Sequence, residues 1–294
     1  MLKFSIITPT YNRGEFLRGA LDSVSRQGYR NYEHIIIDAM STDETADILG
    51  SRSDIVWIRE KDDGLYDAIN KGISRSVGDV IVLLNSDDLL LDGALECAAV
   101  AMSRLPHVDS YCAPVEMGSV DGSTPIVRLP VPRFEELTSE LFFSGIFRIN
   151  GRFFRRGVFN KIGIFNNEYK VAADVDFLAR CLVGGVSSAS GGDPIYRYQC
   201  HEGSLTLGGS IISIDHLNEL ISIADDGGIV KENRAFYRRW GGWLRFYRMV
   251  RFRRWAYFVD FWSFVRKNKE TLAPLMKQIF LHISSRSERR GAPY

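Results

Sequence analysis

The chain has 294 residues, of which 45% are hydrophobic, and its formal net charge is +1. This length fits one large domain or a domain with an appendage. No run of 18 or more apolar residues is present, which excludes a simple membrane-spanning helix, and the first residues lack the pattern of a signal peptide. The 4 cysteines lie far apart without CxxC spacing, so we expect free thiols in a reducing cytoplasm.

The small net charge conceals an asymmetry along the chain. Residues 234–294 contain 12 Arg and 3 Lys against 3 acidic residues, which gives a net charge of +12. Because the whole chain carries +1, the 233 residues before this segment carry −11. An acidic body with a strongly basic end indicates two functions in one chain.

Strand-like and helix-like segments alternate through the first hundred residues. Val and Ile runs predict strands, and apolar residues at i, i+3 and i+4 predict helices. The expected strands span residues 4–8, 34–38, 55–58 and 80–84, and the expected helices span 16–27, a short segment opening at 41–44, and 65–76. This alternation is typical of βαβ units, so we predict an α/β fold with a mostly parallel sheet flanked by helices.

The pattern changes after residue 105. Polar and Gly-rich stretches predict short strands and turns, and renewed apolar periodicity predicts further helices. The expected features are short strands within 108–133 with a hairpin tip at 120–123, helices at 134–143, 158–162 and 174–182, a flexible loop at 184–192, and helix from 211 onward. We therefore predict one domain over residues 1–208, divided near 105, and a basic, aromatic helical extension over 209–294.

Asn85-Ser86-Asp87-Asp88 directly follows the expected strand at 80–84. The carboxyl ends of parallel strands are where open α/β sheets bind ligands. Two adjacent carboxylates repel each other unless a cation lies beside them, and Mg²⁺ or Mn²⁺ prefers oxygen ligands. The alternative is that Asp87 and Asp88 cap a helix that starts near Asp92.

Two other strand ends carry polar residues. The loop 8–13 contains the ring of Tyr11 and leads into a helix N-terminus, so it could stack a base and receive phosphate, or be an ordinary turn. Asp38 ends the second strand and could accept hydrogen bonds from a base or a ribose hydroxyl. The alternative there is helix capping by Ser41 or Asp43.

The segment 65–76 places three polar residues on one helix face. Asp67, Asn70 and Lys71 recur at i, i+3 and i+4, and Lys71 could bind a phosphate or be a solvated surface lysine. No GxGxxG or GxxxxGK[ST] motif follows any strand, so the Rossmann and P-loop phosphate cradles are missing. A diphosphate would have to be held by metal and side chains.

Two residues late in the chain are further candidates. Asp174 begins a helix after Ala172 and Ala173, where an acid is usually a cap. If Asp174 faces the same pocket as Asp88, it is well placed as a general base. His201 is one of 5 histidines and could be a metal ligand or a plain surface histidine.

Taken together, these motifs resemble glycosyltransferase family 2, the inverting enzymes with a GT-A fold. The similarity is greatest to bacterial members that build O-antigen, lipopolysaccharide, capsule or exopolysaccharide. Any one motif is weak, but five in order within residues 4–205 carry the resemblance. The segments are Ser5–Arg13, Ile37–Asp43, Asp63–Gly72, Leu84–Asp88, and Phe153–Arg156 through Ala173–Asp176.

The resemblance implies roles for residues by position. It implies donor binding for Pro9, Tyr11, Arg13, Asp38, Asp67, Asn70, Lys71, Asn85, Ser86 and Asp87. It implies Mn²⁺ or Mg²⁺ at Asp87, Asp88 and His201, and Asp174 falls on the position of the catalytic base. The sequence departs from the family pattern at Ala39-Met40, Asn85, Ile149-Asn150 and Ala173, and none of these departures removes the metal acids or the base.

The expected function is inverting, metal-assisted transfer of a hexosyl or N-acetylhexosaminyl group. The donor would be a nucleotide-diphosphate sugar, expected to be a UDP-sugar, bound by residues 1–105, and a saccharide or lipid-linked acceptor would bind residues 106–208. One alternative is a catalytically degenerate scaffold of a polysaccharide assembly complex at the membrane. Another is a nucleotidyltransferase, but the loop 8–14 has too few glycines for a nucleoside triphosphate.

Arginines alternate with Trp, Tyr and Phe in residues 234–266. This composition suits an anionic membrane surface, with rings at the headgroup level and cations toward lipid. The alternative is an appendage that packs its aromatic residues on the domain. We expect no nucleic-acid partner, because no nucleic-acid-binding module is present and the body is acidic. The expected location is the cytoplasm, peripheral on the inner face of the cell membrane.

Overall fold

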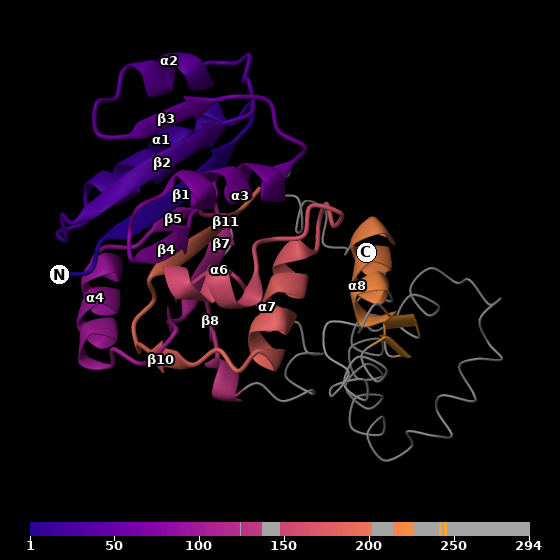
Figure 1. The fold of residues 1–294 in the computed structure, drawn as a ribbon. Helices are drawn as coiled ribbons and strands as arrows, with labels where there is room; N and C mark the ends of the chain where they lie inside the picture. Colours follow the sequence, from indigo (N-terminus) through magenta and orange to yellow (C-terminus); the bar gives the residue numbers. More distant parts are fainter. Residues whose placement is uncertain (124, 137–147, 202–213, 226–240, 243, 246–294) are drawn as a thin grey trace, which may run out of the picture.

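A seven-stranded sheet lies at the centre of the protein (Figure 1). The computed structural model describes residues 1–123, 125–136, 148–201, 214–225, 241–242 and 244–245. The strand order is β10 (Ser188–Ser190), β6 (Ser110–Cys112), β9 (Arg152–Arg155), β4 (Val80–Leu83), β1 (Phe4–Thr10), β2 (Tyr32–Asp38) and β3 (Val56–Arg59). β1 is parallel to both β2 and β4, and β2 is parallel to β3. The predicted α/β fold with a mostly parallel sheet is therefore confirmed.

The helices between these first strands also agree with the predicted alternation. They are α1 (Gly14–Ser25), α2 (Thr45–Gly50) and α3 (Leu65–Arg75). In α1, Leu17, Ala20, Leu21 and Val24 are buried at the predicted i, i+3 and i+4 spacing. The apolar periodicity of the sequence thus fixes which face of α1 meets the sheet.

The other side of the sheet differs from a purely parallel arrangement. β9 lies between β4 and β6 and is antiparallel to both. β10 is parallel to β6 and falls within the segment 184–192 that was predicted to be a flexible loop, so that prediction is wrong. The physical reason is hydrogen bonding: the Ser188 backbone N–H donates to Glu135 Oε1 (2.7 Å), and the Ser110 hydroxyl donates to the Ser187 carbonyl oxygen (3.0 Å).

A four-stranded sheet adjoins the first one. Its order is β5 (Leu89–Leu90), β11 (Tyr196–Cys200), β7 (Val115–Ser119) and β8 (Val127–Leu129). β7 and β8 are antiparallel, and the turn between them includes Gly122, whose φ is 73°, as the predicted hairpin tip at 120–123 requires. β11 pairs with β5, which directly follows Asp88, so residues 196–200 return to the carboxylate pair.

The remaining described helices are α4 (Ala94–Arg104), the 3-10 helix η1 (Phe134–Glu136), α6 (Arg156–Ile162), α7 (Ala173–Val183) and α8 (Ile214–Asp225). The helices predicted at 158–162 and 174–182 are confirmed. Of the predicted helix 134–143, residues 137–143 lie outside the described residues. The prediction of a basic, aromatic segment over 234–266 also falls outside them, apart from residues 241, 242, 244 and 245. No helix in the described part of the chain is long and apolar enough to cross a membrane.

The core consists of two main apolar clusters on opposite faces of the seven-stranded sheet. Alternating side chains of one strand point to opposite faces. Accordingly, Ile81 of β4 belongs to the cluster that contains α7, whereas Val80 and Val82 belong to the cluster that contains α4. Phe154 and Phe153 of β9 divide in the same way.

The two arginines after Phe154 fasten β9 and α6 to the ends of two helices. Arg155 donates from Nε to the Val108 carbonyl (2.7 Å) and from Nη2 to the Met102 carbonyl near the end of α4 (2.7 Å). Arg156 donates to the Gly78 carbonyl and to the Ser76 hydroxyl just after α3. Cations near helix C-termini are favourable, so this part of the family-like motif stabilises the scaffold.

We predict that His34 makes the protein less stable in acid. His34 is 2% exposed in β2, its Nε2 lies 2.9 Å from the Thr8 hydroxyl, and burial lowers its pKa to about 3. Between about pH 6.5, the pKa of His34 in the unfolded chain, and about pH 3, its pKa in the folded chain, His34 is protonated in the unfolded chain but neutral in the folded one. The free energy of unfolding should therefore fall by up to about 1.4 kcal/mol per pH unit from this group alone, from about pH 6.5 toward pH 3.

Urea unfolding between pH 7 and pH 4 checks this prediction. His34→Gln, which keeps hydrogen-bonding capacity but does not titrate, should show a flatter dependence of the unfolding free energy on pH than wild type. The difference between the two proteins isolates His34 from carboxylates that titrate in the same range. Equal slopes would contradict the prediction.

Candidate active site

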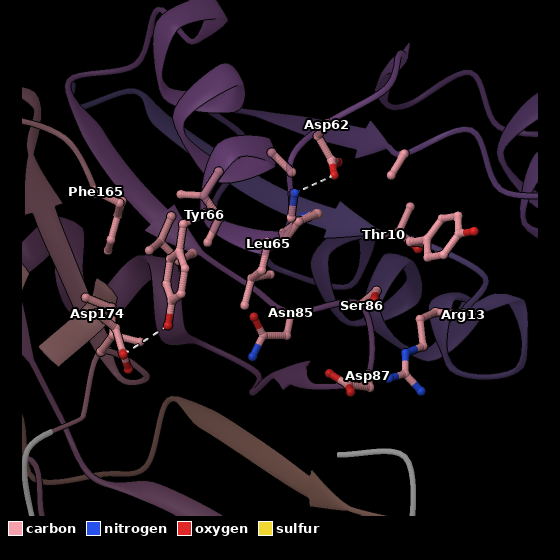
Figure 2. A pocket seen from close by; sticks show the side chains of 18 of the residues that line it. Thr10, Arg13, Asp62, Leu65, Tyr66, Asn85, Ser86, Asp87, Phe165 and Asp174 are labelled. Carbon is pink, nitrogen blue, oxygen red and sulfur yellow. Dashed lines mark hydrogen bonds between the residues drawn. The ribbon is translucent and has the colours of Figure 1, made fainter. Parts of the chain in front are cut away.

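A pocket of about 630 Å³ opens beside the carboxyl ends of β1, β2 and β4. Its walls come from the loops after these strands, from α3 and α7, and from β11. Figure 2 shows Asp174 and Tyr66 at one side of the pocket, Asp87 and Arg13 at the other, and Asn85 and Leu65 between them. This position agrees with the sheet edge at which the sequence places its polar residues.

Six of the residues predicted to bind the donor line this pocket. They are Pro9, Tyr11, Arg13, Asn85, Ser86 and Asp87. The loops after β1 and β2 interlock beneath them. The Ser41 hydroxyl accepts from the Asn12 backbone N–H (2.9 Å), and Asn12 Oδ1 accepts from the Thr42 N–H (2.8 Å). Asn12 has a φ of 50°, a left-handed conformation that Asn tolerates better than most residues. Together with the two hydrogen bonds, this conformation fixes the loop that carries Tyr11 and Arg13.

Asp38 is fully buried behind this loop pair and does not itself line the pocket. Its Oδ1 accepts from the Ser41 N–H (2.9 Å), and its Oδ2 lies 3.5 Å from Arg59 Nε but accepts no hydrogen bond within the described residues. Of the two predicted helix caps, Asp43 accepts hydrogen bonds from the N–H groups of Gly14 (3.0 Å) and Thr45 (3.1 Å). It therefore satisfies amides at the starts of both α1 and α2.

The three polar residues of α3 lie outside the pocket lining. Asp67 forms an ion pair with Lys71 (2.8 Å), and Asn70 bonds to Phe165 through its Nδ2 to the carbonyl (2.9 Å) and its Oδ1 to the N–H (3.0 Å). These contacts hold the loop that carries Phe165, which does line the pocket. Asp67, Asn70 and Lys71 do share one face of α3, as the periodicity predicts. Part of this face contacts the loop at 165–167 instead of the pocket.

Asp88, which was predicted to bind metal, is 1% exposed and has its carboxylate oxygens occupied by protein donors. Its Oδ2 accepts from the Tyr196 hydroxyl (2.6 Å) and Asn85 Nδ2 (3.0 Å), and its Oδ1 accepts from the Gln199 N–H (2.9 Å). Burial and the neighbouring charge of Asp87 raise the pKa of Asp88 to about 7. Asp88 therefore fastens the loop 85–88 to β11 and is not among the residues that line the pocket.

The structure contradicts the alternative in which Asp87 and Asp88 cap the next helix. The residue that precedes α4 is Gly93, and no side chain caps that helix. Asp87 instead lines the pocket, with its Oδ2 3.0 Å from His201 Nε2. The His201 ring stacks on Phe16 with 4.2 Å between ring centroids, and Gln199 Nε2 donates to the Asp87 carbonyl (2.7 Å).

This donor set fits a divalent cation that is completed by its substrate. No cluster of three or more His, Cys, Asp or Glu side chains suited to a metal occurs among the residues that the structure describes. Asp87 and His201 could supply two ligands, and diphosphate oxygens would have to supply others. Mg²⁺ sites in phosphate-handling enzymes have this form, with one or two carboxylates plus substrate phosphates.

Asp174 lies in the first turn of α7 and accepts a hydrogen bond on its Oδ1 from the Tyr66 hydroxyl (3.0 Å), as Figure 2 shows. The Tyr66 oxygen also lies within hydrogen-bonding distance of the Val171 carbonyl (3.1 Å). Burial raises the pKa of Asp174, whereas the hydrogen bond from Tyr66 and the charge of His216 act in the opposite direction. A buried carboxylate with a raised pKa is a stronger base than an ordinary aspartate once it is ionised.

Sequence reasoning missed Tyr66 and Tyr196 as site residues. Tyr66 lies within the family-like segment 63–72. It precedes the apolar Ile69 by three residues, and this spacing indicates that both side chains lie on the buried face of the helix. Tyr196 offered no such signal, because its contact with Asp88 joins residues 108 positions apart. Ile149 and Asn150, which depart from the family pattern, also line the pocket.

Comparison with known proteins bears on the identity of this pocket. A family model described as glycosyl transferase family 2 matches residues 5–163, more than half of the chain. The chain belongs to this family. The resemblance stated from its motifs is thus confirmed, and this family 2 glycosyltransferase carries Asp87 and Asp88 inside the matched region and Asp174 beyond it.

Two bacterial proteins illustrate the curated relatives of this family 2 glycosyltransferase. A PGL/p-HBAD biosynthesis glycosyltransferase of Mycobacterium tuberculosis is 34% identical over 189 residues, which is 61% of this chain and 69% of the relative. An uncharacterized glycosyltransferase of Rickettsia typhi is 31% identical over 185 residues, which is 60% of this chain and 58% of that protein.

Solved structures share the fold of this glycosyltransferase. S. aureus TarS 1-349 in complex with UDP-GlcNAc matches with a TM-score of 0.64 and 20% identity, over 85% of this chain and 73% of that one. The mannosyltransferase PcManGT from Pyrobaculum calidifontis, in complex with GDP-Man and Mn²⁺, matches with a TM-score of 0.58 and 16% identity, over 82% and 71%. The fold is therefore of the GT-A type, as expected from the sequence.

Proposed function

We propose that this glycosyltransferase moves a sugar from a nucleotide-diphosphate donor, a UDP-sugar, to a saccharide or lipid-linked saccharide acceptor with inversion of the anomeric centre. The observation that carries the proposal is the placement of Asp87 and Asp174 in the walls of one pocket. The loops after β1, β2 and β4 would take the nucleotide and diphosphate at the Asp87 side. The acceptor would enter at the Asp174 side.

Asp174 is the proposed general base. An acceptor hydroxyl is a poor nucleophile until its proton is removed, and a carboxylate that takes this proton during attack accelerates transfer by typically ~10²–10⁴-fold. The Tyr66 hydroxyl orients Asp174 Oδ1, and burial of Asp174 strengthens it as a base. A single displacement at the anomeric carbon inverts its configuration and needs no carboxylate as a covalent nucleophile.

Asp87 and His201 are proposed to hold a divalent cation, Mn²⁺ or Mg²⁺, together with the diphosphate. Such a cation would neutralise the negative charge that grows on the departing diphosphate. Asp88 supports this arrangement from behind, because it ties the loop 85–88 to β11, the strand that leads into His201. Gln199 adds a second tie through the Asp87 carbonyl.

Calorimetric titration of UDP, GDP and dTDP, with and without Mn²⁺ or Mg²⁺, tests the proposed function. We expect one nucleotide, UDP, to bind the wild-type protein in a metal-dependent manner. A screen of UDP-sugars for donor hydrolysis and transfer would follow. Failure of all three nucleotides to bind under every metal condition would overturn the proposal.

We also propose that the segment 234–266 attaches the enzyme to anionic membrane on the cytoplasmic side. The support is its alternation of arginines with Trp, Tyr and Phe, which would bring the pocket close to a lipid-linked acceptor. Co-sedimentation should show strong binding to vesicles that contain phosphatidylglycerol, weak binding to phosphatidylcholine vesicles, and loss of binding at high salt. Equal binding to both kinds of vesicle, or none to either, would contradict this proposal.

A further inference from the structure

Helix α8, which follows the catalytic core in the sequence, contacts the segment that carries Asp174. The Glu219 carboxylate accepts three backbone hydrogen bonds, on Oε1 from the Lys170 N–H and on Oε2 from the N–H groups of Val171 and Ala172, each 2.8 Å long. These three residues directly precede α7, whose second residue is Asp174. One side chain thus fixes three consecutive peptide units beside the proposed base.

The position of Glu219 is itself fixed by packing. Leu220, Ile221 and Ile223 of α8 are buried in the same apolar cluster as Phe177 of α7, and the two helices lie side by side (Figure 1). His216 stands three residues before Glu219, so both side chains emerge from the same face of α8. The hydrogen bonds of Glu219 to residues 170–172 place this face of α8 against the segment that leads to Asp174, and His216 interacts electrostatically with Asp174 and Glu219.

The local sequence before α7 cannot provide this support. The residue that precedes α7 is Ala172, which has no side-chain group to bind the free N–H groups at the start of a helix. Glu219 instead binds the N–H groups of the three residues that lead into α7 and so fixes the chain just before its first turn. Hydrogen bonds to a charged acceptor are roughly twice as strong as neutral ones, and a carboxylate near a helix N-terminus is favoured by the helix dipole.

Two side chains from different helices, Glu219 of α8 and Tyr66 of α3, therefore hold the segment 170–174. Glu219 binds the N–H groups of residues 170–172, and the Tyr66 hydroxyl lies within hydrogen-bonding distance of the Val171 carbonyl and donates to Asp174 Oδ1. Of these two, Tyr66 lines the pocket, whereas Glu219 is not among the lining residues. Glu219 is thus placed to affect proton transfer without touching the substrate.

We propose that Glu219 is a positioning residue for sugar transfer, holding residues 170–172 so that Asp174 meets the acceptor hydroxyl in the geometry required for proton removal. This inference rests on the proposed function, in which Asp174 is the general base. A displacement of about 1 Å at a reacting group can reduce the rate by on the order of 10²-fold. Helix α8 would thereby contribute to catalysis although its role is indirect.

The test compares Glu219→Ala and Glu219→Gln in the full chain. For Glu219→Ala, we expect kcat to fall by about 10- to 100-fold, with the donor KM and the nucleotide Kd unchanged. Glu219→Gln keeps one acceptor oxygen and should recover a large part of kcat. Hydrogen exchange should show faster exchange of the backbone amides of residues 170–172 in Glu219→Ala, a readout that does not depend on activity.

Two control variants separate positioning from general loss of stability. Glu168→Ala removes an exposed carboxylate from the same loop, and Ile48→Ala weakens a small apolar cluster formed with α1 and α2. Both should keep kcat near the wild-type value. If Ile48→Ala lowered kcat as much as Glu219→Ala at equal loss of stability, the positioning role would be overturned.

The remaining outcomes distinguish this inference from the proposed function. Unchanged amide exchange in Glu219→Ala would overturn the inference even if wild type transfers sugar. Faster exchange with unchanged kcat would overturn the positioning role. If wild type transferred sugar from no nucleotide-sugar donor, the proposed function would fail and the positioning role with it.

Discussion

Replacing Asp174 with Asn is expected to abolish sugar transfer while leaving nucleotide binding intact. Asn cannot accept the proton of the acceptor hydroxyl, so the loss should reach about 10²–10⁴-fold in kcat. Tyr66 can still donate to the Asn oxygen, so the fold around α7 should remain. The measurement is the transfer rate with a UDP-sugar, together with the UDP Kd from calorimetry and the melting temperature.

Asp176→Asn is a matched control on the same helix. Asp176 is buried and forms an ion pair with Arg180 (2.8 Å), so its loss should reduce stability but preserve transfer in the folded protein. In wild type, kcat should decline on the acidic side at a higher pH than for an ordinary aspartate, because burial raises the pKa of Asp174. An Asp174→Asn protein that kept a tenth of wild-type activity would exclude Asp174 as the general base.

Substitution of Asp87 is expected to affect ligand binding, whereas substitution of Asp88 is expected to affect stability. Asp87→Asn should abolish metal-dependent nucleotide binding and transfer with little effect on stability, since Asp87 faces the pocket. Asp88→Ala should mainly destabilise the fold, because it leaves the Tyr196 hydroxyl, the Asn85 amide and the Gln199 N–H without their acceptor. Each buried group left unpaired costs about 1–3 kcal/mol.

Calorimetry with UDP and Mn²⁺, and urea unfolding of the same samples, check this pair of variants. The reverse pattern, in which Asp88→Ala folds normally but loses the metal, would make Asp88 a metal ligand, as the sequence also implied. Metal-dependent UDP binding that survived in Asp87→Asn would remove Asp87 from the site. The comparison is informative because Asp87 and Asp88 are the same type of residue at adjacent positions.

The strands β1 to β4 could be predicted from sequence because each is a short run of apolar residues bounded by turns. The same logic failed for β10, whose residues are Ser188, Ala189 and Ser190. A strand of small, polar residues has no hydrophobic signature, and its place in the sheet depends on partners such as Glu135 that lie far away in the sequence. Local composition cannot report such pairing.

The candidate site likewise contains residues that the local sequence predicts and residues whose roles depend on distant contacts. Residues at the ends of predicted strands, such as Pro9, Asn85 and Asp87, could be placed because parallel strands bring their carboxyl ends to one edge. The different environments of Asp87 and Asp88 could not be predicted, since adjacent residues carry the same chemistry and they differ in contacts with residues far along the chain, such as Tyr196 and His201. The role of Glu219 was equally invisible, because its partners are backbone amides.

The antiparallel strand β9 has a consequence for the order in which the chain folds during synthesis. β6 pairs with β9 and β10 and has no pairing with β4, although β4 and β6 both leave the ribosome well before β9. Until residues 152–155 emerge, the Val80–Leu83 strand presents an unpaired, apolar edge, which is the kind of surface that invites association between chains. This edge waits for its partner through about 70 residues of elongation, so we expect slow translation across this interval to favour aggregation over closure of the sheet.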